Sequence, residues 1–208
     1  ELGKNINGIL LYGVNASGKS SLMKSVGLNV IMAQAGMFVA ADDFYYNPYH
    51  SIFTRIGNQD NIFKSQSTFE VEMSELRNII KRANSHSLIL GDELCSGTES
   101  ISALAIVSSS IITLYEKLSS LIFATHLHDL ANMKEIKTIE KVVAMHLDVR
   151  FDSETGKLYY DRKLKSGNGK TIYGLEVCKA LDMPKEFIDK ANEIRKSITG
   201  KSQHILDP

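Results

Sequence analysis

The chain has 208 residues, 43% of them hydrophobic and 23% charged, which is ordinary for a globular protein with a buried core. Equal numbers of basic and acidic side chains, 24 each, leave no net charge and therefore no electrostatic signature of nucleic-acid binding. No apolar run reaches the ~18 residues of a membrane-spanning helix, and the cysteines Cys95 and Cys178 form no CxxC pair, so we expect an intracellular protein of a reducing compartment that does not enter a membrane.

The hydrophobic pattern alternates between strands and helices along most of the chain. Short apolar runs indicate strands, and apolar side chains three or four positions apart indicate helices. In chain order the predicted elements are a strand at 7–13, a helix at 20–36, loops and short strands over 42–66, a helix at 67–87, a strand at 87–93, a helix at 99–118, a strand at 120–126, a hairpin of 141–151 with 157–164, and two helices within 174–198 that break near Pro184. This order predicts an α/β fold with a mainly parallel sheet and helices on both faces, and ligands in such folds lie beyond the carboxyl ends of the strands.

The stretch GVNASGKSSL at 13–22 follows the first predicted strand and opens the first predicted helix. Gly13, Gly18, Lys19 and Ser20 satisfy the pattern G-x-x-x-x-G-K-[ST] of a phosphate-binding loop, here called the P-loop. Glycines let the backbone N–H groups point at phosphates, and the helix adds its positive N-terminus. Lys19 would reach the β- and γ-phosphates of a nucleotide, and Ser20 would ligate Mg²⁺. A chance match in an ordinary loop is the alternative, which the flanking strand and helix disfavour.

Acidic residues end the strand at 87–93, and a histidine ends the strand at 120–126. Asp92 would provide Mg²⁺ with a carboxylate, directly or through water. Glu93 would orient and deprotonate the attacking water. His126 would touch the γ-phosphate or that water. Taken alone, an acidic turn or a histidine after a strand is often structural, but beside a P-loop these residues predict nucleotide hydrolysis.

A metal site is the competing interpretation of THLHD at 125–129. The stretch is similar to the start of a two-metal hydrolase motif, T-H-x-H-x-D-H. Asp129 lies one position too early for that motif, and no histidine follows it. Because ligand spacing is the basis of such a motif, the metal interpretation is disfavoured.

The order of these motifs resembles ABC-type ATPases and, in detail, the MutS proteins. The chain has no LSGGQ-like signature of the transporters; SQSTFEVEMSE at 65–75 stands in its place and resembles the STFMVEM segment of MutS proteins. Further MutS-like segments follow in order along nearly the whole chain: residues 13–41, FTRIGNQDNI at 53–62, GDELCSGTES at 91–100, LIFATHLHDL at 121–130, and residues 172–194. Departures from the family pattern are Val14 for proline, Ser65-Gln66 for Gly-Arg, and Ser96 for the arginine of the GRGT turn. They indicate a divergent member, similar to giant-virus and organellar relatives.

The resemblance implies an ATPase that uses ATP and Mg²⁺ at sites completed by a facing domain. Ser67 would reach the partner's γ-phosphate from a helix N-terminus, beyond its ordinary role as an N-cap. Lys19, Glu93 and His126 would be catalytic, with His126 sensing the γ-phosphate, and Ser20 and Asp92 would hold the metal. The nucleotide would be bound by Gly13, Asn15, Ala16, Ser17, Gly18, Lys19, Ser20 and Ser21.

The family's adenine-stacking aromatic precedes the strand at 9–12, and we expect the chain to start too late to contain it. Tyr160 or Arg162 is a candidate to approach the base instead. The chain opens on Glu1 instead of Met, so we expect it to be cut from something longer. The resemblance divides it into an ABC-type ATPase domain at 1–171, a helix-turn-helix dimerisation segment at 172–198 and a disordered tail at 199–208.

The expected partner is an identical or paralogous chain, bound through the ATPase faces and the C-terminal helices. The apolar face of those helices consists of Leu175, Val177, Cys178, Leu181, Phe187, Ile188, Ala191 and Ile194. Periodicity alone equally allows this face to be core packing. Mismatched duplex DNA would be held by domains outside these residues. Alternatives are an ABC-type ATPase coupled to transport or to another DNA-maintenance process, and a nucleotide-dependent dimerisation scaffold without turnover.

Overall fold

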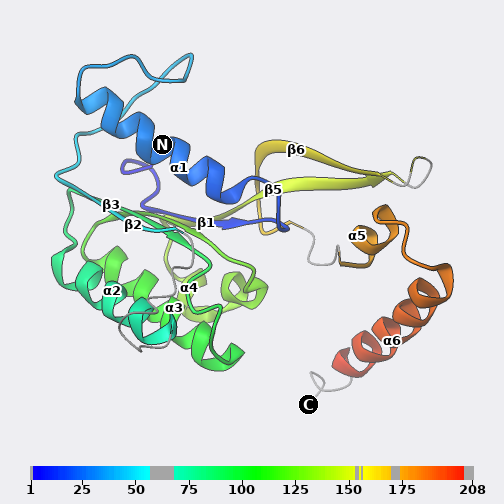
Figure 1. Cartoon of the computed structure of the whole chain (residues 1–208). Helices are drawn as coiled ribbons and strands as arrows, with labels where there is room; N and C mark the ends of the chain where they lie inside the picture. The colour runs from blue at the N-terminus through cyan, green and yellow to red at the C-terminus, as the bar shows by residue number, and fades with distance from the viewer. Residues whose placement is uncertain (1, 57–67, 153–154, 156, 170–173, 204–208) are drawn as a thin grey trace. The chain divides into compact units, whose positions relative to one another are not determined.

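The computed structural model describes residues 2–56, 68–152, 155, 157–169 and 174–203 (Figure 1). The chain divides into two compact units. The first consists of Glu1–Asp148 and Arg162–Gly169, and the second of Val149–Asp161 and Lys170–Pro208. The P-loop and the predicted catalytic residues all belong to the first unit.

A six-stranded sheet has the order β2-β3-β4-β1-β5-β6. Its strands are β1 (Gly8–Tyr12), β2 (Ser51–Arg55), β3 (Ser87–Asp92), β4 (Ser120–Ala124), β5 (Val142–Asp152) and β6 (Lys157–Ser166). β1 pairs in parallel with β4 and β5, and β3 pairs in parallel with β2 and β4. The predicted mainly parallel sheet is therefore confirmed.

The helices of the first unit cover both faces of this sheet, as predicted (Figure 1). Helix α1 (Lys19–Gln34) lies on one face. Helices α2 (Thr68–Arg82), α3 (Ser100–Glu116) and α4 (Lys134–Lys137) lie on the other. Together, the parallel strands and the two helical layers form a mixed α/β fold.

Each face of the sheet has its own hydrophobic core, because alternate side chains of a strand point to opposite faces. On the α1 face, strand residues pack against Met23 and Val30. On the opposite face they pack against Ile79 of α2 and Ile111 of α3. The strand residues of the α1 face are Leu11, Leu88, Leu90, Ile122, Ala124 and Leu147, and those of the opposite face include Leu10, Tyr12, Ile89, Leu121 and Phe123. Burial on both faces accounts for the continuous apolar runs of the central strands.

Helix α2 ends earlier than its sequence pattern predicts, at Arg82 instead of residue 87. A turn at Asn84 replaces the last helical residues. The Oδ1 atom of Asn84 accepts a hydrogen bond from the N–H of His86 at 2.9 Å, and the carbonyl of Asn84 accepts one from the N–H of Ser87 at 3.0 Å. Asparagine competes with the helix in this way through its own side chain, and the chain enters β3 directly afterwards.

Two helices in the second unit confirm the predicted break near Pro184. They are α5 (Gly174–Ala180) and α6 (Lys185–Gln203), and Asp182 between them has a positive φ of 53°. Helix α6 continues through residues 199–203, where the sequence predicted a disordered tail, so that prediction is wrong for these residues. A polar composition does not end a helix, and Gly200 costs only about 1 kcal/mol within one. Residues 204–208 lie outside the described part of the chain.

Candidate functional site

The P-loop connects the end of β1 to the start of α1 by a path that requires glycine at two positions. Gly13 has a φ of 153°, and a Cβ atom at this position would lie 2.6 Å from the Oγ atom of Ser17. Gly18 has a φ of 105° and forms the N-cap of α1. Side chains other than glycine are strained in this left-handed region. The pattern recognised in the sequence is therefore also the pattern that the backbone demands.

The N-terminus of α1 presents unsatisfied donors at the P-loop. Its N-cap makes no side-chain hydrogen bond, and the first N–H groups of a helix have no partner within the helix. Such a terminus attracts anions through its N–H groups and its dipole. Asn15, Ala16 and Ser21 are exposed around it, whereas Ser17 is buried and its Oγ atom has no hydrogen-bond partner among the described residues.

Lys19, the first residue of α1, is buried and directed into the loop. Its Nζ atom donates hydrogen bonds to the carbonyl of Gly13 at 2.7 Å and to that of Val14 at 3.4 Å. The same atom lies 3.7 Å from the Oε1 atom of Glu93. The ammonium group thus lies between the P-loop backbone and the acidic end of β3, where it can neutralise charge on a bound phosphate.

The hydroxyl of Ser20 donates a hydrogen bond to Asp92 Oδ2 at 2.5 Å, across 72 positions of sequence. The second carboxylate oxygen of Asp92, Oδ1, is buried and has no hydrogen-bond partner within the described ranges. An unsatisfied buried oxygen costs free energy unless a cation or donor compensates it. Hydroxyl and carboxylate oxygens are ligands that Mg²⁺ prefers, so the residues present fit the predicted metal.

Glu93 and His126 meet because β3 and β4 are adjacent parallel strands that end at the same level. Asp92 is paired with Ala124, and the N–H of Glu93 donates to the carbonyl of Ala124 at 2.9 Å. The Nδ1 atom of His126 lies 3.8 Å from the Oε1 atom of Glu93. A cavity of about 170 Å³ is lined by both residues together with Thr125. This distance exceeds that of a hydrogen bond, but the two side chains face one space large enough for water.

Three residues beside this site were not predicted from the sequence. Thr125 joins β4 to β1, since its N–H donates to the carbonyl of Leu11 at 3.0 Å. Its hydroxyl accepts the N–H of Leu127 at 3.0 Å, which shapes the turn after His126. Tyr12 and His128 stack with ring centroids 5.3 Å apart and an interplanar angle of 22°. The histidine at 128 was visible in THLHD, but spacing alone gave it no structural partner.

Burial determines the protonation of this aromatic pair. It raises the pKa of Tyr12 to about 12. Burial, and then the proximity of His126, lowers the pKa of His128 below its ordinary 6.5. The lowered pKa favours the neutral ring of His128, which stacks on buried Tyr12.

The predicted roles of Ser67, Tyr160 and Arg162 stay predictions. Ser67 lies outside the described residues. Arg162 is exposed on β6 and has a φ of 54°. Tyr160 is half-buried on the same strand and belongs to the second unit. The alternative of a metal site at THLHD gains no further ligand, because in the described part of the chain no three His, Cys, Asp or Glu side chains are grouped as metal ligands would be.

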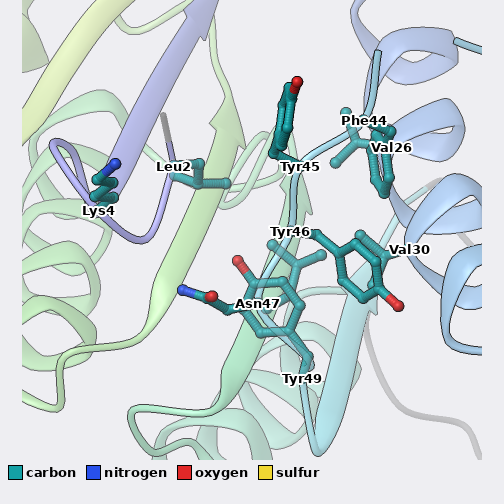
Figure 2. A pocket seen from close by; sticks show the side chains of 10 residues that line it. Leu2, Lys4, Val26, Val30, Phe44, Tyr45, Tyr46, Asn47 and Tyr49 are labelled. Atoms are coloured by element: carbon teal, nitrogen blue, oxygen red, sulfur yellow. The ribbon is translucent and has the colours of Figure 1, made fainter. Parts of the chain in front are cut away.

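A cavity of about 640 Å³ lies on the α1 face at the amino ends of β1 and β3 (Figure 2). Its lining is mostly aromatic and aliphatic: Leu2, Lys4, Val26, Val30, Phe44, Tyr45, Tyr46, Asn47, Tyr49 and Leu88. A pocket of this size and polarity is a common candidate for a ligand site. However, the P-loop and the residues predicted to be catalytic lie at the carboxyl ends of the strands, so we place the candidate site there.

These observations define a mixed α/β protein with a P-loop sequence at the carboxyl edge of a parallel sheet. The family model of MutS domain V matches residues 9–199 of the chain. The chain belongs to the MutS family. Within the described ranges, no helix has the length and apolar character needed to cross a membrane.

Relatives from a virus, an animal and a bacterium are similar over almost the whole chain. A mutS homolog of Acanthamoeba polyphaga mimivirus is 44% identical over 100% of this chain and 19% of its own length. A mitochondrial DNA mismatch repair protein mutS homolog of Sarcophyton glaucum is 44% identical over 92% of this chain and 19% of its own length. The DNA mismatch repair protein MutS of Listeria welshimeri is 34% identical over 99% of this chain and 24% of its own length. The chain thus spans 19% to 24% of the length of these relatives.

Proposed function

We propose that this chain binds and hydrolyses ATP as the ABC-type ATPase part of a MutS-like DNA mismatch-repair protein. The observation that carries the proposal is the convergence of four features at one edge of the sheet: the P-loop, Asp92, Glu93 and His126. Ser20 contacts Asp92, and Glu93 lies within 4 Å of both Lys19 and His126. Membership of the MutS family supports the same conclusion.

Each residue has a distinct role in this proposal. The P-loop N–H groups and Lys19 bind the β- and γ-phosphates. Ser20 and Asp92 hold Mg²⁺, which, when bound, withdraws charge from the phosphates. Glu93 accepts a proton from the water that attacks the γ-phosphorus, so that the bond to the leaving ADP oxygen breaks and phosphate is formed. His126 donates a hydrogen bond to the γ-phosphate.

Two such chains, identical or paralogous, would face each other, with Ser67 of one reaching the nucleotide of the other. Exposed apolar side chains on the C-terminal helices support this pairing. Phe187, Ile194 and Ile198 of α6 are each at least 49% exposed, and apolar clusters of this kind mark binding surfaces. ATP binding would close the paired sites and hydrolysis would open them.

The proposed role in DNA repair is supported by the relatives, which are named as DNA mismatch repair proteins. Domains outside these residues would hold the mismatched duplex and respond to the ATP cycle. We therefore expect the 208-residue chain alone not to discriminate a mismatch. Mismatch selectivity retained by this chain alone would contradict the assignment of DNA contacts to other domains.

The direct test is Mg²⁺-dependent release of phosphate from ATP by the purified chain, compared with Lys19→Ala. Removal of a buried charge that contacts the phosphates is expected to lower turnover by at least ~100-fold. Lys24→Ala is the matched control, because Lys24 lies on the same helix and is exposed; its turnover should equal that of the wild type. ATP binding without any turnover in the wild type would favour the dimerisation scaffold instead.

The DNA part of the proposal needs the full-length protein. Its binding to a G·T-mismatched duplex and to the matched duplex should be compared at one salt concentration, with and without ATP. Preferential mismatch binding that ATP weakens is the expected result. Equal binding to both duplexes would leave the ATPase in place but would move its substrate to branched or undamaged DNA.

A further inference from the structure

Glu72 is a buried acidic residue in the second turn of α2, outside the P-loop and the ends of the strands. It is 5% exposed. Its Oε1 atom accepts a hydrogen bond of 3.0 Å from the backbone N–H of Cys95, and this bond is buried. A carboxylate is costly to bury unless its partners compensate it. The side chain is therefore held at a specific place instead of being solvated.

The partner of Glu72 lies in the turn that directly follows β3 and begins with Glu93. Two residues of this turn, Glu93 and Cys95, have positive φ angles of 49° and 63°. A left-handed conformation of a residue other than glycine costs about 1 kcal/mol or more and persists only where its surroundings impose it. The backbone bonds within the turn, from Ser96 to Glu93 and from Thr98 to Cys95, are both 3.3 Å long. The bond to the Glu72 carboxylate is shorter than both, and it restrains the turn together with the 2.9 Å bond from the N–H of Glu93 to the carbonyl of Ala124.

We infer that Glu72 is a positioning residue for Glu93, an inference that rests on the proposed ATP hydrolysis. Its carboxylate holds the N–H of Cys95 and thereby fixes the strained turn. The fixed turn keeps the Glu93 carboxylate 3.7 Å from Lys19 Nζ and 3.8 Å from His126 Nδ1. Because the same bond joins α2 to the turn, a displacement of α2 would also displace Glu93.

The surroundings of Cys95 support this role. Burial and the nearby Glu72 raise the pKa of the Cys95 thiol to about 11, so the thiol stays protonated and does not act as a nucleophile. The side chain of Cys95 is part of the hydrophobic core. What Cys95 contributes beside packing is thus its backbone N–H, whose direction is set by the positive φ.

A matched set of variants in the full 208-residue chain tests the inference. Glu72→Ala removes the acceptor, whereas Glu72→Gln keeps an acceptor oxygen at the same place. Glu75→Ala is the control, because Glu75 lies one turn further along α2 and pairs with Arg55 of β2 at 2.9 Å, away from the turn. We expect Glu72→Ala to lower kcat by ~10- to 100-fold, as small misplacements of a catalytic group do, with the Kd for ATP within about twofold of wild type.

Glu72→Gln should restore most of kcat, and Glu75→Ala should leave it unchanged. Wild-type kcat in Glu72→Ala, or the same loss in Glu75→Ala, would overturn the positioning role. Thermal unfolding of each variant separates the effect on kcat from a loss of folded protein. If Glu72→Gln and Glu72→Ala unfold at the same temperature but Glu72→Gln has the higher kcat, the difference is due to the hydrogen bond.

Amide hydrogen exchange at Cys95 tests the contact independently of turnover. The N–H should be protected in wild type and in Glu72→Gln, and should exchange at least ~10-fold faster in Glu72→Ala. Unchanged exchange in Glu72→Ala would overturn the inference even in an active enzyme. A wild-type chain that shows no ATP turnover would refute the proposed function, while the exchange measurement would still decide whether Glu72 holds the turn.

Discussion

The sheet of the first unit and the helices of the second differ in how they use their apolar residues. On both faces of the sheet these residues are covered by helices of the same chain. In α6, Ile188 is 6% exposed, but Phe187, Ile194 and Ile198 are 49%, 52% and 60% exposed. The central strands are thus covered by helices of the same chain, whereas α6 leaves an apolar stripe exposed to water. The candidate site and the packed core coincide in the first region, whereas the apolar face of α6 is where we propose that a partner binds.

Negative charges introduced on the exposed face of α6 should have the largest effect, a loss of the proposed dimer. Phe187→Glu combined with Ile194→Glu would place two carboxylates in the proposed contact, which should weaken dimerisation by at least ~100-fold. ATP turnover per chain should then lose its dependence on protein concentration. Sedimentation and turnover measured over the same concentration range provide the check.

Lys190→Glu is the control for this experiment, because Lys190 is an exposed polar residue of the same helix. The Lys190→Glu variant should have the same sedimenting mass and the same ATP turnover as the wild type. A double variant that keeps the wild-type mass and concentration profile would show that the exposed face of α6 is not the contact between chains.

The packing of the first unit is tested by Gly91→Ala in β3. A Cβ atom there would lie 2.6 Å from two ring atoms of Phe123, which is buried. Overpacking of this kind should lower the free energy of unfolding by about 1–3 kcal/mol, as measured by denaturant titration.

Gly27→Ala in α1 is a useful comparison for this variant. Its Cβ atom would lie 2.9 Å from the flexible end of Leu90, and a helix favours alanine over glycine by about 1 kcal/mol. We expect the two effects nearly to cancel. A free energy of unfolding in Gly91→Ala as close to wild type as in Gly27→Ala would mean that the core around Phe123 can rearrange.

The smallest expected effect concerns pH. The pKa of His128 is lowered in the folded chain, so below pH 6.5 the unfolded chain binds a proton that the folded chain does not. The contribution of His128 to the free energy of unfolding should therefore be fully present above about pH 6.5, and it should be lost as the pH decreases through the folded pKa. His128→Phe keeps a ring beside Tyr12 without a titrating group, so its unfolding free energy should depend less on pH between 7.5 and 5.5. Parallel curves for variant and wild type would assign the pH dependence to other groups.

The parts of the site that could be predicted from the sequence are those that follow from local pattern and strand order. The P-loop is contiguous, and its glycines are required by the backbone at Gly13 and Gly18. The contact between Ser20 and Asp92 could be anticipated because parallel strands of one sheet end at a common edge. The residues of both cores follow from the alternation along the central strands.

The parts that could not be predicted depend on single side chains that bond to a backbone group. Glu72 accepts a hydrogen bond from the backbone N–H of Cys95, 23 positions further along the chain. Almost any residue type could donate such a bond, so the sequence at position 95 does not reveal it. The end of α2 depends on the side chain of Asn84, which overrides an otherwise helical pattern. The sequence could not show that Phe187 and Ile194 are exposed, because helical periodicity identifies an apolar face but does not show what covers that face.

Glu93→Gln in the purified chain tests the hydrolytic site with the fewest assumptions. The variant keeps the size of the side chain but removes the base, so ATP and Mg²⁺ binding should stay within about threefold of wild type. Phosphate release should fall by at least ~100-fold, the usual contribution of a general base. Turnover equal to wild type would contradict the assignment of the attacking water to Glu93, and with it the proposal that this edge of the sheet hydrolyses ATP.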